Sequence, residues 1–245
     1  MQWRLILHPA NDAFSNMAID EALLRKGIPT LRFYTWKPSA ISIGYFQCIE
    51  DEVNLEECKR QRVDVVRRIT GGGAVYHDEN GEITYSIVCP QNMLPQNIMD
   101  SYSIICSSIA HGLKYVGIKA EHAGINDIIV NDKKISGSAQ TRRYGNVLQH
   151  GTILLKVNVK KMFSLLKVSK EKISDKQIKR AEERVTSIEN EIGEISKEEV
   201  INAIMRGFRE KMKIKFFEGK MDEKEKELAE KLRVKYESKE WNFKR

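Results

Sequence analysis

The sequence has little or none of several features that identify the class of a protein directly. It has only four cysteines among 245 residues, and they form no CxxC pair and no spacing typical of a metal site. Its five prolines make no proline-rich linker. No apolar run approaches the roughly 20 residues that span a bilayer, and the first twelve residues lack the apolar core of a secretory signal. We therefore expect a cytoplasmic protein with reduced cysteines and no membrane contact.

Two familiar phosphate-binding patterns, GxxxxGK[ST] and GxGxxG, are also absent. The charge is unbalanced, with a formal net charge of +7, a sign that attracts acidic partners or nucleic acid. However, lysine and glutamate are interleaved in "KEKISDKQIKRAEER" at 170–184, as on a solvated helix face. Because no stripe of arginine and aromatic residues accompanies them, we expect no nucleic-acid partner.

What the sequence does contain is an alternation of helical and strand patterns. The helical spacing at 16–26 predicts a helix that starts from Ser15 or Asn16 as cap and stops at Gly27. A capping box at Ser196 and Glu199 predicts another helix. Further helices are predicted at 54–61, 99–116 and 222–238, and strands at 30–36, 39–46, 63–69, 82–89, 126–131 and 147–157. We expect one α/β domain over 1–245, mainly helical from about 157.

The stretch "VVRRITGGGAVYHDENGEITYSIV" at 65–88 contains Gly71, Gly72 and Gly73 in a row. Each glycine costs roughly 0.5–1 kcal/mol of stability relative to alanine, so three together need a reason. A hairpin turn is one, although a hairpin needs only one or two glycines. The alternative is a loop whose backbone approaches a ligand, and Arg67 and Arg68 just before it favour an anionic ligand.

Two other positions carry possible site chemistry. His77 and Asp78 are adjacent on a strand and point to opposite faces, so we expect one in the site and the other holding the turn. Lys133 and Lys134 precede "SGSA" in "DKKISGSAQTRRYGN" at 132–146. Small residues beside a lysine let its amine lie against a bound ligand, which is the functional interpretation. The alternative is an exposed polar hairpin between two strands, in which the lysines are solvated and bind nothing.

Taken together, "RRITGGGAVYHD", "NDIIVNDKKISGSAQ" and "QHGTILL" resemble the lipoate–protein ligase A family, part of the wider biotin/lipoate ligase and octanoyltransferase fold. "FYTWKPSAISIGYFQ" and "NMAIDEAL" resemble two further motifs of that family. The resemblance covers residues 1 to about 155 strongly and the remainder more loosely. It implies mixed sheets flanked by helices, with a pocket for a lipoyl chain and for ATP carried with Mg²⁺.

The resemblance also assigns roles to single residues. Lys134 matches the family's catalytic lysine, whose ammonium would bridge the acid's carboxyl oxygen and the α-phosphate. Arg68 would lie near the acid or the phosphates. The other positions that the resemblance places in the substrate and ATP site are Gly71, Gly72, Gly73, Val75, His77, Asn126, Asp127, Ser136, Gly137, His150, Trp36 and Tyr45.

A ligase of this kind activates lipoate or octanoate as an acyl-adenylate. It then transfers the acyl group to the lysine of a lipoyl domain, as in the E2 component of 2-oxoacid dehydrogenases or the H protein of glycine cleavage. Acidic acceptors of this sort would suit a basic surface. Related bacterial ligases carry an additional small C-terminal domain. Because this chain stops where their large domain ends, we expect a separate small accessory subunit.

Three alternatives remain open. An octanoyltransferase of the same fold would pass the acyl group through a cysteine thioester, which needs a thiolate in the pocket. The corresponding loop, "AEHAGINDIIV" at 120–130, has no cysteine, and none follows Cys106. A biotin ligase has its glycine–arginine motif in a different order. A non-catalytic subunit that binds lipoyl domains would have no need of Lys134 and three glycines.

Overall fold

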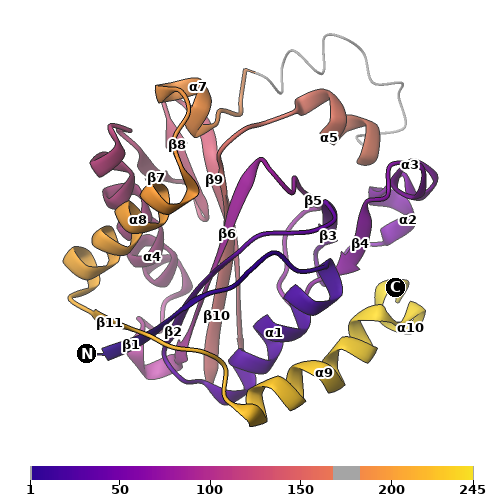
Figure 1. Cartoon of the computed structure of the whole chain (residues 1–245), viewed down its shortest axis with the longest axis horizontal. Helices are drawn as coiled ribbons and strands as arrows, with labels where there is room; N and C mark the ends of the chain where they lie inside the picture. The colour runs from indigo at the N-terminus through magenta and orange to yellow at the C-terminus, as the bar shows by residue number, and fades with distance from the viewer. Residues whose placement is uncertain (1, 168–182, 245) are drawn as a thin grey trace.

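The computed structural model describes residues 2–167 and 183–244, which form two β-sheets with helices on both sides (Figure 1). Within these residues the larger sheet has the strand order β11-β1-β2-β6-β10-β9-β8-β7, and the smaller sheet has the order β4-β3-β5. The large sheet consists of β1 (Gln2–Leu7), β2 (Thr30–Tyr34), β6 (Glu82–Pro90), β7 (Glu121–Ala123), β8 (Asp127–Val130), β9 (Lys133–Arg143), β10 (Asn146–Leu154) and β11 (Lys215–Glu218). The small sheet consists of β3 (Ala40–Ile43), β4 (Asp64–Arg67) and β5 (Val75–His77).

The long helices cover the two faces of the large sheet, as Figure 1 shows. On one face α4 (Ile98–Leu113) packs against α8 (Lys197–Met212). On the other face α1 (Ala13–Lys26) packs against α9 (Glu223–Glu237), beside the small sheet. The shorter helices are α2 (Ile49–Glu52), α3 (Leu55–Arg60), α5 (Val159–Leu165), α7 (Ile188–Ile192) and α10 (Lys239–Asn242), with 3₁₀ turns η1 (Gln91–Met93) and η2 (Lys114–Val116). Mixed sheets flanked by helices are the predicted fold class.

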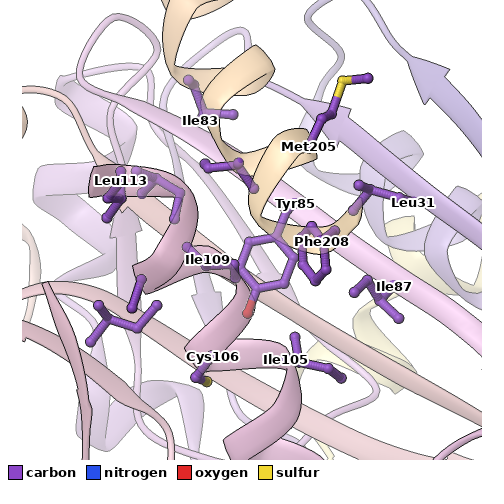
Figure 2. Close-up of a cluster of buried hydrophobic side chains, with 14 of the residues drawn as sticks. Leu31, Ile83, Tyr85, Ile87, Ile105, Cys106, Ile109, Leu113, Met205 and Phe208 are labelled. Carbon is purple, nitrogen blue, oxygen red and sulfur yellow. The ribbon is translucent and has the colours of Figure 1, made fainter. Parts of the chain in front are cut away.

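The alternation along β6 separates the hydrophobic core from the functional side of the sheet. Tyr85 and Ile87 lie in the core beneath α4 and α8, where Figure 2 shows the Tyr85 ring among the side chains of both helices. Thr84 and Ser86 alternate with them and therefore point to the opposite face. This orientation directs polar side chains of a central strand toward the side of the small sheet.

Helix α1 begins three residues earlier than predicted. Its N-cap is Asp12, whose carboxylate accepts from the Ser15 N–H at 2.8 Å. The predicted cap Asn16 is instead a buried helical residue, and its side-chain amide donates to the Asn11 carbonyl. The predicted stop is confirmed, because Gly27 has φ 69°, a left-handed conformation that favours glycine. The capping box of α8 is also confirmed.

Several strands were not predicted. The polar stretch at 132–146 is not a loop between strands but mostly strand β9, paired with both β8 and β10. Strand β11 lies in the tail that was expected to be mainly helical, and it pairs in parallel with β1, itself unpredicted. Short strands β5 and β7 were missed as well. Most of the expected solvated helix at 170–184 lies outside the described residues.

Among the residues that the structure describes, no helix is both long and apolar enough to cross a lipid bilayer.

Candidate active site

A cavity of about 330 Å³ lies where the polar face of the large sheet meets the small sheet. The glycine loop and the predicted catalytic lysine both line it, which is the convergence that the sequence motifs predicted. Among the predicted residues, its wall contains Trp36, Arg68, Gly72, Gly73, Val75, His77, Asn126, Lys134, Gly137 and His150. The wall also contains residues that sequence reasoning missed, including Met17, Ser42, Glu82, Asn158 and Val185.

Arg68 shapes the glycine loop. Its buried guanidinium donates to the carbonyl oxygens of Gly71 at 2.7 Å and Gly73 at 2.8 Å. Burial lowers the pKa of Arg68 to about 10, so the group stays charged at neutral pH. Glycine is also required at position 44, where a Cβ would lie 1.9 Å from the Gly72 carbonyl oxygen. The loop is therefore held by its carbonyl groups.

The N–H groups of Gly71, Gly72 and Gly73 form no hydrogen bond with any described residue. Free backbone N–H groups in a glycine loop are suitable donors for an anionic oxygen. Gly72 and Gly73 belong to the cavity wall, whereas Gly71 does not. The loop can thus offer donors to a carboxylate or phosphate, while Arg68 positions the loop itself.

The expectation that Arg67 would also favour an anionic ligand is wrong. Its guanidinium is fully buried and bonds to backbone carbonyls on two separate segments. The acceptors are the carbonyl oxygens of Gly44, Tyr45, Gln47, Trp241, Asn242 and Lys244. Arg67 ends β4 and Arg68 follows it, and neighbouring residues of an extended chain face opposite sides, so only one of the two arginines reaches the cavity.

A β-bulge in the large sheet sets the direction of the Lys134 side chain. The register between β8 and β9 shifts between Ile128 and Ile129, so that Ile129 pairs with Lys134, and such a bulge redirects side chains. The ammonium lies 2.7 Å from a carboxylate oxygen of Asp127. Asp127 lies outside the cavity wall and therefore contacts the lysine rather than the cavity. A Cβ on Gly137 would lie 2.6 Å from the lysine Nζ.

A second group of polar side chains lies deeper, around His77. Its Nδ1 is 2.8 Å from a Glu82 carboxylate oxygen, and its Nε2 is 2.8 Å from the Ser42 hydroxyl. The Trp36 ring stacks on the imidazole with centroids 4.0 Å apart, and the indole N–H donates to the Thr84 hydroxyl. Asp78, by contrast, accepts from the Asn80 N–H in the turn that follows. The predicted division of roles is supported only in part, because Asp78 holds the turn but also belongs to the cavity wall together with His77.

His150 belongs to another buried network. Its Nδ1 is 3.0 Å from Asp20 and its Nε2 is 2.7 Å from the Thr70 hydroxyl, at the base of the glycine loop. Burial lowers the pKa of His150, which favours the neutral imidazole. Asp20 also accepts from Arg32 at 2.8 Å and from the Tyr34 hydroxyl at 2.9 Å. The network links α1, β2, β10 and the glycine loop.

Besides Gly71 and Asp127, two further predicted site residues, Tyr45 and Ser136, lie outside the cavity wall. The Tyr45 ring contacts Trp241 and lies beneath Arg143 and Lys244, because the chain turns away after Gly44. Ser136 pairs with Ile128 and Ile153, both in the core beneath α4 and α8. Paired residues of adjacent strands share a face, so Ser136 faces that core.

Comparison with known proteins places the chain in a family. Residues 12–209 match the lipoyl protein ligase A/B catalytic domain. Octanoyltransferase LipM of Clostridioides difficile is 38% identical, over 100% of this chain and 99% of the relative. LipM of Brevibacillus brevis is 36% identical, over 100% and 99%.

The fold is shared with solved lipoate–protein ligases. An archaeal lipoylation system from Thermoplasma acidophilum, described as a bipartite lipoate protein ligase and its E2 lipoyl domain, matches at 35% identity and TM-score 0.92, over 99% of this chain and 96% of that one. Lipoate-protein ligase A solved with ATP matches at 33% identity and TM-score 0.86, over 99% of each chain. The chain belongs to the lipoyl protein ligase A/B catalytic-domain family, and the relatives described above are named as octanoyltransferases and lipoate–protein ligases.

The names of the curated relatives support the octanoyltransferase alternative better than the ATP-dependent ligase that the motifs favoured. The cysteine chemistry expected of such a transferase has no counterpart in the cavity, because none of the four cysteines belongs to its wall. Burial raises the pKa of Cys58 and Cys106 to about 11 and that of Cys89 to about 12. Cys48 precedes α2, outside the cavity.

Proposed function

We propose that this chain activates lipoate or octanoate with ATP and transfers the acyl group to the lysine of a lipoyl domain. The observation that carries the proposal is that the described residues lining the cavity include Lys134 but no cysteine, and that the N–H groups of the glycine loop bond to none of the described residues. Without a thiolate the acyl group needs another form of activation. A mixed anhydride with AMP supplies a leaving group that a free carboxylate lacks.

Different residues of the cavity would have different roles in this reaction. The N–H groups of Gly72 and Gly73 would bind anionic oxygens of the substrates, and Mg²⁺ would enter with the nucleotide. The Lys134 ammonium, a compact charge on a flexible stem, would leave Asp127 to stabilise the negative charge that develops between the acid and the α-phosphate. The apolar part of the cavity wall, which includes Met17, Trp36 and Met162, would hold the acyl chain.

Substitution of Lys134 tests this role. We expect Lys134→Ala to slow ATP-dependent pyrophosphate release in the presence of lipoate or octanoate by about 10²–10³-fold, the usual effect of losing one electrostatic contact in a transition state. Lys134→Arg should not restore the rate, because a planar fork does not replace a point charge. Lys133→Ala is the matched control, since Lys133 is adjacent and lies outside the cavity wall. An unchanged rate for Lys134→Ala would refute the assignment.

The acceptors we propose are acidic lipoyl domains, such as those of E2 components and the glycine-cleavage H protein, together with a separate small accessory subunit. The similarity to a bipartite archaeal ligase supports the second subunit. Pyrophosphate release should therefore be measured with and without that subunit. Full activity of the isolated chain would contradict the need for a partner, without affecting the role of Lys134.

Octanoyl transfer from a carrier-protein thioester is the second candidate, supported by the names of the curated relatives. The two reactions are separated by incubating a lipoyl domain with either octanoate and ATP or an octanoyl thioester without ATP. A gain of mass on the lipoyl domain only in the first mixture supports the ligase. A gain only in the second supports the transferase.

A further inference from the structure

Cationic and aromatic side chains from separate segments of the chain meet outside the cavity. They follow β3, end β9, belong to α9, or lie in and after α10: Tyr45, Phe46, Arg143, Lys235, Trp241 and Lys244. We call these six residues the cationic patch. None of them belongs to the cavity wall, so the reaction proposed for the cavity leaves them without a role.

The cations of the patch lie over aromatic rings. Lys244 Nζ is 3.5 Å from the centroid of the Tyr45 ring and 3.7 Å from that of Trp241. The guanidinium carbon of Arg143 is 4.8 Å from the Tyr45 centroid, and Lys235 Nζ is 3.8 Å from the Trp241 centroid. All of these distances fall within the range in which a ring attracts a cation. The rings therefore gather positive charges at one place without the help of carboxylates.

Positive charge in the patch exceeds negative charge. Among the residues that the structure describes, no carboxylate forms an ion pair with Arg143 or Lys244. Lys235 pairs with Glu21 at 2.6 Å, but that carboxylate is buried and not offered to a partner. Burial lowers the pKa of Lys244, and the charges of neighbouring cations lower it further. An anionic partner would relieve this crowding of like charges.

The patch adjoins the glycine loop. The Tyr45 N–H donates to the carbonyl of Thr70, the residue before the loop, at 2.8 Å. The preceding Gly44 lies directly against the Gly72 carbonyl. Figure 1 shows the C-terminal segment close to β4, the strand that leads into the loop. A protein bound to the patch would therefore lie beside the cavity.

Exposed aromatic side chains indicate that the partner is a protein surface rather than a small anion. Phe46 is 87% exposed, and its ring packs edge-on against Tyr45 with centroids 4.9 Å apart. Phe243, which precedes Lys244, is 44% exposed. A small anion would leave these rings in water, whereas a protein would bury them. Aromatic residues and arginine are enriched where proteins bind one another.

We propose that the cationic patch binds an acidic face of the lipoyl domain and thereby places the acceptor lysine at the cavity. The inference rests on the proposed transfer to lipoyl domains, and it adds the surface on which that protein substrate binds. Nucleic acid also binds cations and aromatic rings. The location of the patch favours the lipoyl domain, because a protein that receives the acyl group has to bind beside the cavity.

The test measures binding separately from chemistry. An isotopically labelled apo lipoyl domain of an E2 component is titrated with the full chain, and NMR gives the Kd. We expect the double charge reversal Arg143→Glu with Lys244→Glu to raise the Kd and the acceptor KM by about 10-fold or more, because like charges would face each other. Pyrophosphate release from ATP and lipoate or octanoate should stay within about twofold of the wild-type rate. Added salt should weaken wild-type binding more than that of the variant.

Lys119→Glu with Lys211→Glu is the matched control. Both lysines are exposed and lie on the α4 and α8 side of the large sheet, so this variant has the same net charge with an intact patch. Its Kd should stay close to the wild-type value. Phe46→Ala, which changes no charge, should also weaken binding, as expected for an aromatic contact within an interface. Near-ultraviolet circular dichroism shows whether each variant is folded.

The outcomes separate this inference from the proposed ligase. An equal Kd for the wild type and the folded Arg143→Glu, Lys244→Glu variant overturns the inference, as does an equal loss of binding in the control. Binding of a single-stranded oligonucleotide but not of the lipoyl domain overturns it too. Wild-type pyrophosphate release with no effect of the patch on binding refutes this inference alone. Binding through the patch by a chain that releases no pyrophosphate refutes the ligase alone.

Discussion

Gly137 determines where the ammonium of Lys134 can lie. The lysine side chain crosses the strand over this glycine to reach Asp127, and a Cβ at position 137 would lie 2.6 Å from both Cε and Nζ. Only the absence of a side chain permits that path. The small residues after the lysine in the sequence, which suggested a ligand-facing amine, therefore have a direct steric explanation.

We expect Gly137→Ala to lower acyl transfer by about 10-fold or more, because a displacement of about 1 Å at a catalytic group can cost 10²-fold. The clash involves the mobile end of a side chain, so the free energy of unfolding should change by less than about 1 kcal/mol. The double variant Gly137→Ala with Lys134→Ala should be no slower than Lys134→Ala alone, since residues that act through one another are not additive. Additive losses would show that Gly137 acts independently of the lysine.

At the scale of secondary-structure elements, Arg67 joins the C-terminal segment to the chain beside the glycine loop. Its guanidinium bonds to carbonyl groups after β3 and to carbonyl groups at the end of α10, and its own N–H donates to the Asn242 side chain. Figure 1 shows the C-terminus close to β4. The segment around α10 therefore helps to hold β4 and the neighbouring glycine loop in position.

We expect Arg67→Met to lower the free energy of unfolding by about 3 kcal/mol or more, because several buried carbonyls lose a charged donor. Urea unfolding measures this change, and hydrogen exchange should become faster in α10. Arg60→Met is the control, since Arg60 is an exposed partner of Glu57 and exposed ion pairs contribute little to stability. A loss below about 1 kcal/mol with unchanged exchange in α10 would show that the arginine does not hold this helix.

The sequence motifs identified residues that line the cavity better than they identified the strands and buried side chains that hold those residues in place. Gly72, Gly73, His77 and Lys134 could be predicted because each belongs to a local pattern of consecutive residues. Glu82 could not, because it became part of the site only when β6 was placed beside β5. Strand β9 was missed for a related reason: the residues with which it lines the cavity are a lysine and small residues, so its sequence lacks the apolar alternation by which half-buried strands are recognised.

At the scale of the whole molecule, the buried polar networks on the site side of the large sheet make stability depend on pH. Burial and the charge of Arg32 lower the pKa of His8 from 6.5 to about 4, and burial lowers the pKa of His150. Burial by itself raises the pKa of Asp20, but hydrogen bonding from His150 and the charge of Arg32 lower it overall. All three groups bind protons less readily in the folded chain than in the unfolded chain.

Stability should consequently fall as the pH falls. Because the unfolded chain takes up protons first, the histidine contribution is complete above about pH 6.5 and is lost progressively toward pH 4, and that of Asp20 is lost at still lower pH. For His8 alone the loss between about pH 7.5 and pH 5 should stay below about 2 kcal/mol, because the imidazole is only partly buried and solvent screens its interactions. Urea unfolding followed by tryptophan fluorescence should show a lower midpoint at pH 5, and His8→Gln, whose amide oxygen can still accept from Arg32, should show a smaller difference. A midpoint that is constant or rises on acidification would mean that these histidines are protonated in the folded chain, and that His150 cannot be the neutral partner of Asp20 beneath the glycine loop.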